Sequence, residues 1–260
     1  MSKTIPAYPE GKNLLAGKNV LITAAAGTGI GFAVAKRCAE EGAEIIISDI
    51  HERRLGEAAE RLEDVCGKKP HAFLCNVTQE DDIQSLFSNT IDAVGHIDVL
   101  MNNAGLGGTA NVVDMTDEQW TMVLDVTLNG TFRATRAALK HMMPRGTGAI
   151  INNASVIGWR AQKGQAHYAA AKAGVMALTR CSALEAAEAG VRINAVSPSL
   201  AMHPYLSKVT PDELLAELTA KEAFGRAAEP WEVANVMVFL ASDYSSYMTG
   251  EVLSVSSQHP

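Results

Sequence analysis

Tyr168 and Lys172 stand four residues apart in an alanine-rich run, so on a helix they share one face. An ammonium group beside a phenol favours the phenolate and is expected to pull the phenol pKa below its usual value of about 10. Tyr168 is therefore a candidate general acid and base for proton exchange with a hydroxyl or carbonyl group. Ser155 follows the apolar run 149–151, where a strand would end, and its hydroxyl could hold the same substrate oxygen.

These three residues also have an ordinary structural explanation. A Tyr-x-x-x-Lys spacing arises often by chance in a chain with five tyrosines. A serine at the end of a strand is more often a cap or a turn former than a catalytic group. The spacing therefore indicates chemistry only if a cofactor or substrate site is encoded elsewhere in the chain.

A glycine-rich segment near the N-terminus could provide that site. An apolar run at 20–22 leads into it, and a helical pattern follows as far as Glu41. Its residues are Gly27, Thr28, Gly29, Ile30 and Gly31. Glycines let the backbone approach a pyrophosphate, and the helix N-terminus behind them offers free N–H groups and partial positive charge. A plain tight turn between strand and helix would show the same glycines.

Asp49, at the end of the next predicted strand (44–48), favours the dinucleotide interpretation. A carboxylate about 20 residues beyond the glycines can accept hydrogen bonds from both hydroxyls of an adenosine ribose. The same charge would repel a 2′-phosphate, so NAD is the expected cofactor and NADP the less favoured one. Arg53 and Arg54 weaken that preference unless they belong to the solvated face of the following helix.

Strand and helix patterns alternate along the rest of the chain. Further strands are predicted at 71–75, 98–101, 149–152, 192–196 and 252–255, and helices at 52–65, 79–94, 117–142, 168–188 and 230–240. This alternation predicts an α/β fold with a doubly wound parallel sheet of about seven strands and helices on both faces. Ligands of such sheets lie at the carboxyl ends of the strands, which would bring Gly27, Asp49, Asn103, Ser155 and Pro198 to one edge.

Length and composition limit the classes of function. We expect a single domain over residues 15–260 behind a flexible N-terminal segment of residues 1–14. The net charge of −7 argues against nucleic acid or an anionic membrane as partner. The four cysteines lack metal-ligand spacing, and the chain shows neither a signal peptide nor a membrane span. We therefore expect a cytoplasmic protein that acts on a small molecule without a metal.

In this order, the motifs resemble the short-chain dehydrogenase/reductase family from Leu15 to Val255. The motifs that carry the resemblance are Gly29-Ile30-Gly31, Asp49, Asn102-Asn103-Ala104-Gly105, Ser155, Tyr168-x-x-x-Lys172, Asn194-Ala195-Val196-Ser197-Pro198, and Phe239-Leu240-Ala241-Ser242 with Thr249-Gly250. The resemblance implies a Rossmann fold and hydride transfer between a nicotinamide and a secondary alcohol or ketone. Tyr168 would be the acid and base, Lys172 would lower its pKa and hold the nicotinamide ribose, and Ser155 would orient the substrate oxygen.

The resemblance also implies a wider set of binding residues. Besides the glycine turn and Asp49, the cofactor residues would be Asn76, Val77, Asn103, Ala104, Gly105, Tyr168, Lys172, Pro198, Ala201 and His203. The substrate residues would be Ser155, Arg160, Met202 and Tyr205, in part under a lid at about 199–224. Arg160 could clamp an anionic tail of the substrate, or it could be a solvated loop charge.

Several positions depart from the family pattern. Ala24 or Ala25 replaces the first glycine of the family, Asn76 an aspartate, and His203 a threonine. Thr127 falls where the family has a catalytic asparagine that holds a water linking the lysine to solvent. We count Thr127 with the catalytic residues, although its shorter side chain puts that relay in doubt.

The glycine turn and the Ser-Ser-Gln-His-Pro end resemble a branch of the family associated with breakdown of steroid-derived rings and acyl chains. That resemblance implies a bulky alcohol that carries a carboxylate or a CoA thioester. Two alternatives remain: reduction of a 3-oxoacyl thioester on acyl-carrier protein or CoA, and an NAD-binding regulatory or structural subunit, for which Thr127 is the motive. The helix of Tyr168 is apolar almost all round, which predicts a homo-oligomer, and the family suggests a tetramer.

Overall fold

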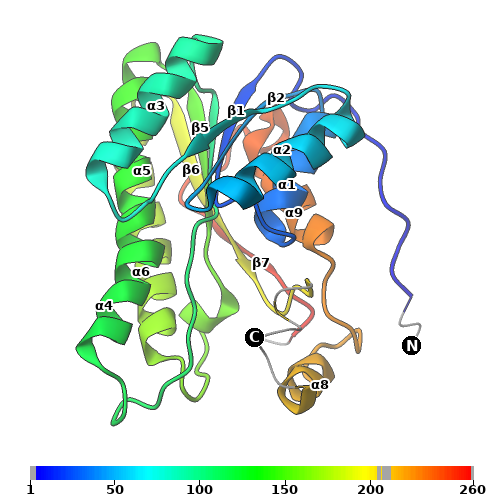
Figure 1. Cartoon of the computed structure of the whole chain (residues 1–260), viewed down its shortest axis with the longest axis vertical. Coiled ribbons are helices and arrows are strands. Elements are labelled where there is room, and N and C mark those ends of the chain that lie inside the picture. Colours follow the sequence, from blue (N-terminus) through cyan, green and yellow to red (C-terminus); the bar gives the residue numbers. More distant parts are fainter. Residues whose placement is uncertain (1–3, 204–205, 207–211, 259–260) are drawn as a thin grey trace.

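In a computed structural model that describes residues 4–203, 206 and 212–258, seven strands form one parallel sheet in the order β3-β2-β1-β4-β5-β6-β7 (Figure 1). The strands are β1 (Asn19–Thr23), β2 (Glu44–Asp49), β3 (His71–Leu74), β4 (Val99–Asn102), β5 (Gly148–Asn153), β6 (Val191–Pro198) and β7 (Val252–Val255). The strand order reverses between β1 and β4, where doubly wound sheets bind their ligands. The predicted fold class is confirmed.

Helices cover both faces of the sheet, as Figure 1 shows. On one face lie α1 (Ile30–Glu40), α2 (Glu52–Cys66) and α9 (Pro230–Ala241); on the other lie α3 (Glu80–Val94), α4 (Asp117–Leu124), α5 (Gly130–Met142) and α6 (Ala166–Ala187). A further helix, α8 (Asp212–Ala220), lies away from the sheet near the C-terminus (Figure 1). Alternate residues of each strand serve the two faces: Val20 and Ile22 pack with α1 and α9, while Leu21 packs with α3 and α5.

The helix predicted over 117–142 is interrupted, and that prediction is wrong in its continuity. A π-helical turn, η1 (Asp125–Asn129), separates α4 from α5. Thr127 lies in this turn, and its side chain is buried. Gly130 follows directly and packs so closely that a Cβ there would lie 2.8 Å from Cγ2 of Val77. Helical periodicity at 3.6 residues per turn does not report such a turn.

Buried amides lock the two central strands to the helices beneath the site. Asn102 and Asn152 lie opposite each other in β4 and β5. Nδ2 of Asn102 donates to Oδ1 of Asn152 (2.9 Å) and to Oγ1 of Thr135 on α5 (3.1 Å). Nδ2 of Asn152 donates to Oγ1 of Thr179 on α6 (2.9 Å). This satisfied polar ladder fixes strand register and helix position together.

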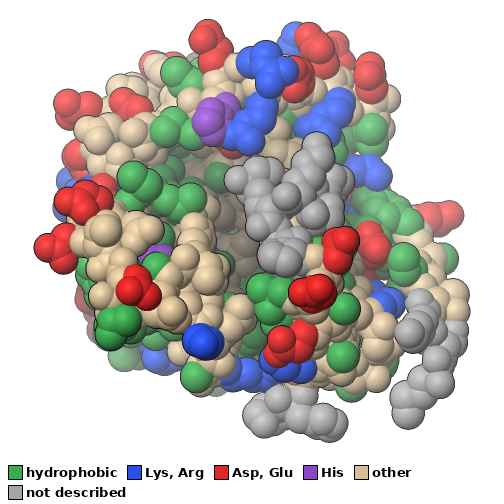
Figure 2. Space-filling view, turned by 60° about the horizontal axis from the view of Figure 1, so that its bottom comes forward, with side chains coloured by type: hydrophobic (Ala, Val, Ile, Leu, Met, Phe, Trp, Pro, Cys, Tyr) green, Lys and Arg blue, Asp and Glu red, His purple; other side chains and the backbone are tan. Residues whose placement is uncertain are grey.

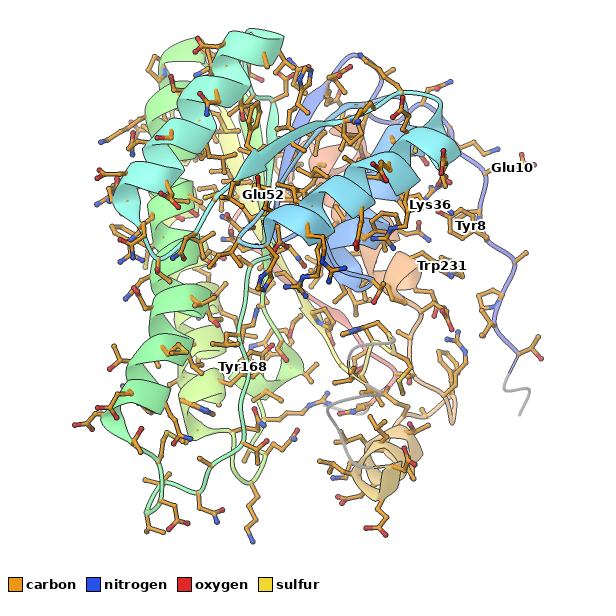
Figure 3. The ribbon with its side chains drawn as sticks, viewed as in Figure 1. Tyr8, Glu10, Lys36, Glu52, Tyr168 and Trp231 are labelled. Carbon is orange, nitrogen blue, oxygen red and sulfur yellow. The ribbon has the colours of Figure 1, made fainter. Side chains whose placement is uncertain are left out.

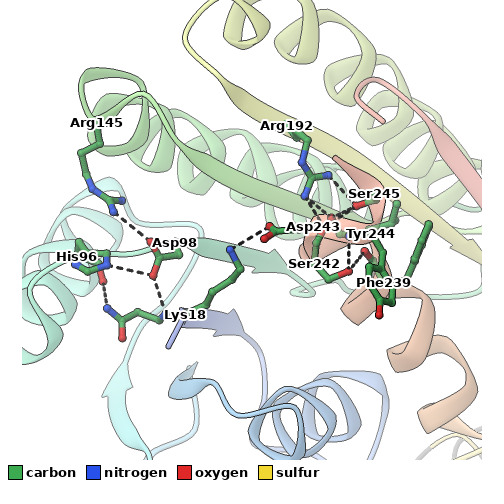
Figure 4. Close-up of polar contacts among 12 residues, drawn as sticks. Lys18, His96, Asp98, Arg145, Arg192, Phe239, Ser242, Asp243, Tyr244 and Ser245 are labelled. Atoms are coloured by element: carbon green, nitrogen blue, oxygen red, sulfur yellow. Dashed lines mark hydrogen bonds and ion pairs between the residues drawn. The ribbon is translucent and has the colours of Figure 1, made fainter. Parts of the chain in front are cut away.

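A second polar network closes the amino edge of the sheet (Figure 4). Arg192 donates to the carbonyls of Leu240 (3.0 Å) and Ser242 (3.2 Å), where its charge also meets the C-terminus of α9. Nearby, Asp98 accepts from Arg145 (3.1 Å), and Lys18 pairs with Asp243 (3.3 Å). The contacts lie at the end of the strands opposite to Ser155, so they stabilise the sheet without entering the candidate site.

The N-terminal segment packs along α1 and α9. The Tyr8 ring meets Trp231 edge-on with ring centroids 5.4 Å apart, and its hydroxyl donates to Glu40 (2.7 Å) (Figure 3). Buried Glu41 accepts from the N–H groups of Lys12 (2.7 Å) and Leu14 (3.1 Å). The flexibility expected for residues 1–14 stays a prediction, and these contacts show where residues 8–14 attach.

Candidate active site

The glycine turn has the close packing that a phosphate cradle needs. Ala24 adopts a left-handed conformation (φ 53°), which costs an L-residue about 1–2 kcal/mol. Its carbonyl accepts from Nδ2 of Asn103 (3.0 Å), which helps to hold this conformation. A Cβ at Gly31 would lie 2.4 Å from that carbonyl oxygen, so this position requires glycine. The backbone thus keeps a tight turn even though alanine stands at the first glycine position of the family.

Gly31→Ala tests this packing. We expect a loss of about 1–3 kcal/mol in the free energy of unfolding, because the methyl group would push into the backbone carbonyl of Ala24 and into the amide nitrogen of Asn103 that is bonded to it. The cradle should also bind NADH more weakly. Urea unfolding and NADH fluorescence titration measure the two effects. Gly56→Ala, on α2 with nothing within 4 Å of the added Cβ, is the matched control. Equal behaviour of the two variants would contradict the close approach at Gly31.

Arg61 on α2 supports the glycine turn, and sequence reasoning missed it. Its Nη2 donates to the carbonyl oxygen of Gly27 (3.0 Å), and its guanidinium lies 4.2 Å from the centroid of the Phe32 ring. The carbonyl is thereby held toward α2, and the first turn of α1 carries no acidic residue. Both features favour an anion at the N-terminus of α1. In the sequence, Arg61 is indistinguishable from the solvated charges around it.

Asp49, the last residue of β2, lies beside the glycine turn. Its carboxylate accepts from the N–H groups of Ala26 (3.3 Å) and His51 (3.0 Å). Burial raises the pKa of Asp49, while the Ala26 N–H and the charge of Arg54 act in the opposite direction.

Asn76 follows β3 and is oriented by Thr78. Oδ1 of Asn76 accepts from both N and Oγ1 of Thr78 (3.1 and 2.9 Å), so a contact to a ligand would use its amide nitrogen.

Asn103, Asn153 and Lys172 form a connected polar group at the ends of β4 and β5. Nδ2 of Asn153 donates to Oδ1 of Asn103 (3.0 Å), and Nζ of Lys172 donates to the Asn153 carbonyl (2.5 Å). Oδ1 of Asn153 is buried and has no hydrogen-bond partner among the described residues. A buried acceptor without a partner is what a ligand hydroxyl or amide would satisfy. The residues present therefore fit a nicotinamide dinucleotide, and Asn153 joins the predicted set.

Tyr168, Lys172 and Ser155 come together at this edge. Nζ of Lys172 lies 5.5 Å from the centroid of the Tyr168 ring, and Figure 3 places Tyr168 on α6 beside the sheet. Ser155 lies two residues after the end of β5, and its Oγ accepts from the Ile157 N–H (3.3 Å). The three side chains therefore lie close together, and their catalytic roles stay a prediction.

The pKa of Tyr168 departs from the sequence expectation. Burial raises it to about 12, and a hydrogen bond with Ser155 acts in the opposite direction. Burial also lowers the pKa of Lys172 to about 8, since only 3% of this residue is exposed. The shared pocket thus disfavours both charged forms, and the phenol retains its proton near neutral pH. The sequence argument counted the neighbouring charge but could not count the loss of solvent.

Thr127, in the π-helical turn, lies near the loop that passes Lys172. Its hydroxyl accepts from the Leu106 N–H (3.0 Å) and donates to the Leu106 carbonyl (3.2 Å). A Cβ at Gly105 would lie 3.5 Å from Nζ of Lys172 and 3.9 Å from Oγ1 of Thr127. The loop after β4 therefore passes close to both residues, with Ala104 held through its N–H by Thr23. Catalytic participation of Thr127 stays a prediction.

The segment after β6 brings His203 over the glycine turn. Two atoms of its ring would lie 3.5 Å from a Cβ at Gly29, and burial lowers its pKa. Pro198 ends β6, Ala201 forms a bridge with Ala228, and the Met202 N–H donates to Ala228 (2.9 Å). Tyr205 and most of 204–211 lie outside the described residues. Figure 2, which brings this edge forward, shows a hollow in the surface between the described elements.

Residues 24–257 match the family described as enoyl-(acyl carrier protein) reductase. The chain is a short-chain dehydrogenase/reductase. It is 62% identical over 257 residues to (5R,7aS)-5-hydroxy-7a-methyl-1-oxo-2,3,5,6,7,7a-hexahydro-1H-indene-carboxyl-CoA reductase of Mycobacterium tuberculosis, covering 98% of each chain. It is also 39% identical to 3-oxoacyl-[acyl-carrier-protein] reductase FabG of Thermotoga maritima, covering 93% of this chain and 97% of the relative.

A crystal structure of a short chain dehydrogenase from Mycobacterium smegmatis has the same architecture. It is 56% identical, has a TM-score of 0.88 and covers 99% of both chains. Membership of the family establishes this chain as an oxidoreductase that uses a nicotinamide cofactor. The predicted family and the assignment as an enzyme are confirmed.

Metal sites and membrane-spanning helices were two further features to look for in this short-chain dehydrogenase/reductase. Within residues 4–203, 206 and 212–258, no group of three His, Cys, Asp or Glu side chains gathers as a metal site. Across the same part of the chain, every helix is too short or too polar to span a bilayer.

Proposed function

We propose that this enzyme transfers hydride between NAD and the carbinol carbon of a ring-bearing secondary alcohol, which carries a carboxylate or a CoA thioester. The observation that supports it is the pairing of half-buried Tyr168 with buried Lys172 beside Ser155, at the edge where the glycine turn lies. The substrate class rests on the 62% identical relative, whose name describes a reductase of a hydroxylated ring linked to CoA.

In this proposal the chain contributes orientation and proton transfer. NAD⁺, when bound, supplies the hydride acceptor and a positive charge. Ser155 donates a hydrogen bond to the substrate oxygen, and Tyr168 takes the hydroxyl proton as the carbinol carbon loses hydride. Because burial keeps the phenol protonated near neutral pH, Tyr168 must first lose a proton, a step that Lys172 favours when charged. In the reductive direction the protonated phenol is already the required acid.

Asp49 supports the choice of NAD. Its buried carboxylate stands at the end of β2, next to the glycine turn, with both oxygens fixed by backbone N–H groups. An adenosine 2′-phosphate would have to lie against this carboxylate. We propose NAD as the cofactor in use and NADP as the poorer one.

The FabG relative favours a second candidate function, reduction of a 3-oxoacyl thioester. A substrate screen separates the two. The enzyme would be assayed with NAD⁺ and NADP⁺ on ring alcohols that bear a carboxylate or a CoA thioester, and with NADH and NADPH on acetoacetyl-CoA. We expect the highest kcat/KM on a ring alcohol with NAD⁺. A preference for acetoacetyl-CoA with NADPH would support the second function. No turnover on either substrate would favour the non-catalytic alternative raised by Thr127.

A homotetramer in the cytoplasm is part of the proposal. On its outer face, α6 exposes Leu184, and Trp120 and Met122 of the contacting helix α4 are also exposed. Large apolar groups on adjoining helices are typical of a subunit interface. Light scattering coupled to gel filtration measures the number of subunits directly.

The proposed cytoplasmic location rests on the cysteines. All four are free thiols, as a reducing compartment would keep them.

A further inference from the structure

Arg160, on the loop between Ser155 and α6, is a cation held by neutral groups. Its Nη1 donates to Oε1 of Gln258 (2.5 Å) and its Nη2 to the Gln258 carbonyl (3.5 Å). No carboxylate of the described residues pairs with it, whereas Arg37, Arg145 and Arg226 each form an ion pair. Guanidinium groups bind carboxylates and phosphates more strongly than amides, so this partner can be exchanged for an anion.

Gln258 is fixed in one orientation by the residue on its other side. Its Nε2 donates to Oε1 of Glu222 (2.8 Å), and Ser257 donates to Oε2 of the same carboxylate (2.7 Å). Glu222 is only 3% exposed and also accepts from the Leu200 N–H (3.3 Å). Since a carboxylate only accepts and a guanidinium only donates, the amide must present nitrogen to Glu222 and oxygen to Arg160. The C-terminal residues thereby join the catalytic loop to the segment after α8.

The backbone of Arg160 is tied to the catalytic serine. The Gly158 N–H donates to the Ser155 carbonyl (2.9 Å), and the Arg160 N–H donates to the Val156 carbonyl (2.9 Å). A Cβ at Gly158 would lie 3.0 Å from the Ala173 nitrogen, so this turn packs directly on α6 next to Lys172. Gln258 follows β7, and its partner Glu222 holds Leu200 just beyond the end of β6. Arg160 therefore stands at the carboxyl edge of the sheet, in the same loop as Ser155.

We propose that Arg160 binds the negatively charged group of the substrate and that Gln258 is the neutral partner it leaves when the anion binds. The inference deepens the proposed function and rests on it. An incoming anion replaces a neutral hydrogen bond by a charge-assisted one, while Gln258 keeps its bond to Glu222. An uncharged alcohol gains nothing from this exchange. The anion is either a ring carboxylate or a phosphate of CoA, which offer the guanidinium the same chemistry.

Three variants and three probes test the assignment. Arg160→Gln removes the cation, Gln258→Glu gives it a permanent carboxylate, and Lys163→Gln removes a charge from an exposed residue of the same loop as the control. The probes are a hydroxycyclohexane carboxylate, its CoA thioester and its uncharged methyl ester. We expect Arg160→Gln and Gln258→Glu to raise KM by about 10- to 100-fold for the probe whose anion Arg160 binds, and to change KM for the methyl ester by a much smaller factor. Lys163→Gln should behave like the wild type.

The pattern of loss identifies the anion. An effect on the carboxylate alone assigns a ring carboxylate, and an effect on the CoA thioester alone assigns a CoA phosphate. If Arg160→Gln changes all three probes equally, or none, the assignment is overturned. Circular dichroism and NADH affinity check that each variant is folded, and Arg160→Gln decides the matter if Gln258→Glu is unfolded beside Glu222. Failure of the wild type to oxidise any probe would instead count against the proposed function.

Discussion

Tyr168→Phe is expected to lower kcat by about 10²- to 10⁴-fold, the contribution of a positioned acid and base. The substitution removes only the hydroxyl, so the ring that packs near Lys172 remains and cofactor binding should be nearly unchanged. Steady-state rates on the best substrate of the screen, with NADH affinity measured in parallel, give the two quantities. A loss of both together would indicate a structural role.

The control for this substitution is Tyr244→Phe, since Tyr244 is 75% exposed at the far end of α9. The pH profile gives a further check. Because burial raises the pKa of Tyr168 to about 12, the phenolate fraction is still increasing throughout the range from neutral to alkaline pH, and wild-type oxidation should accelerate over that range. The residual activity of Tyr168→Phe should lack that rise. A Phe variant with wild-type turnover would remove Tyr168 from the chemistry.

Asp49→Asn should reverse or abolish the preference for NAD. The amide retains the size of the side chain but cannot repel a 2′-phosphate, and it loses the charge-assisted hydrogen bonds to the ribose. We expect kcat/KM for NAD⁺ to fall by about 10- to 100-fold, while the value for NADP⁺ rises. Arg54, whose charge already acts on Asp49, would then stand next to the phosphate.

Asp64→Asn provides the matched control, because Asp64 is an exposed acid on α2 and its loss changes the net charge equally. The measurement is the ratio of kcat/KM for the two cofactors in each variant. An unchanged ratio in Asp49→Asn would show that another residue selects the cofactor.

Local patterns in the sequence were enough to predict the architecture and to nominate the residues of the candidate site. The alternation of apolar strands with helices predicts the parallel sheet, because side-chain periodicity is set by each element alone. The positions of Gly27, Asp49 and Ser155 at or after strand ends likewise predict that these residues meet at one edge of the sheet. The interrupted helix at 125–129 was missed, since a π-helical turn does not alter the apolar pattern enough to be read.

Only the tertiary structure decided the electrostatics and the long-range contacts of the site. The pKa of Tyr168 depends on burial by the whole fold, which no spacing between residues 168 and 172 reports. The contact of Arg160 with Gln258 joins residues 98 positions apart, and that of Arg61 with Gly27 joins residues 34 apart. The local sequence determines which side chains share a face of one helix or strand. Burial from solvent and contacts between distant segments arise only when the whole chain folds, so the local sequence does not report them.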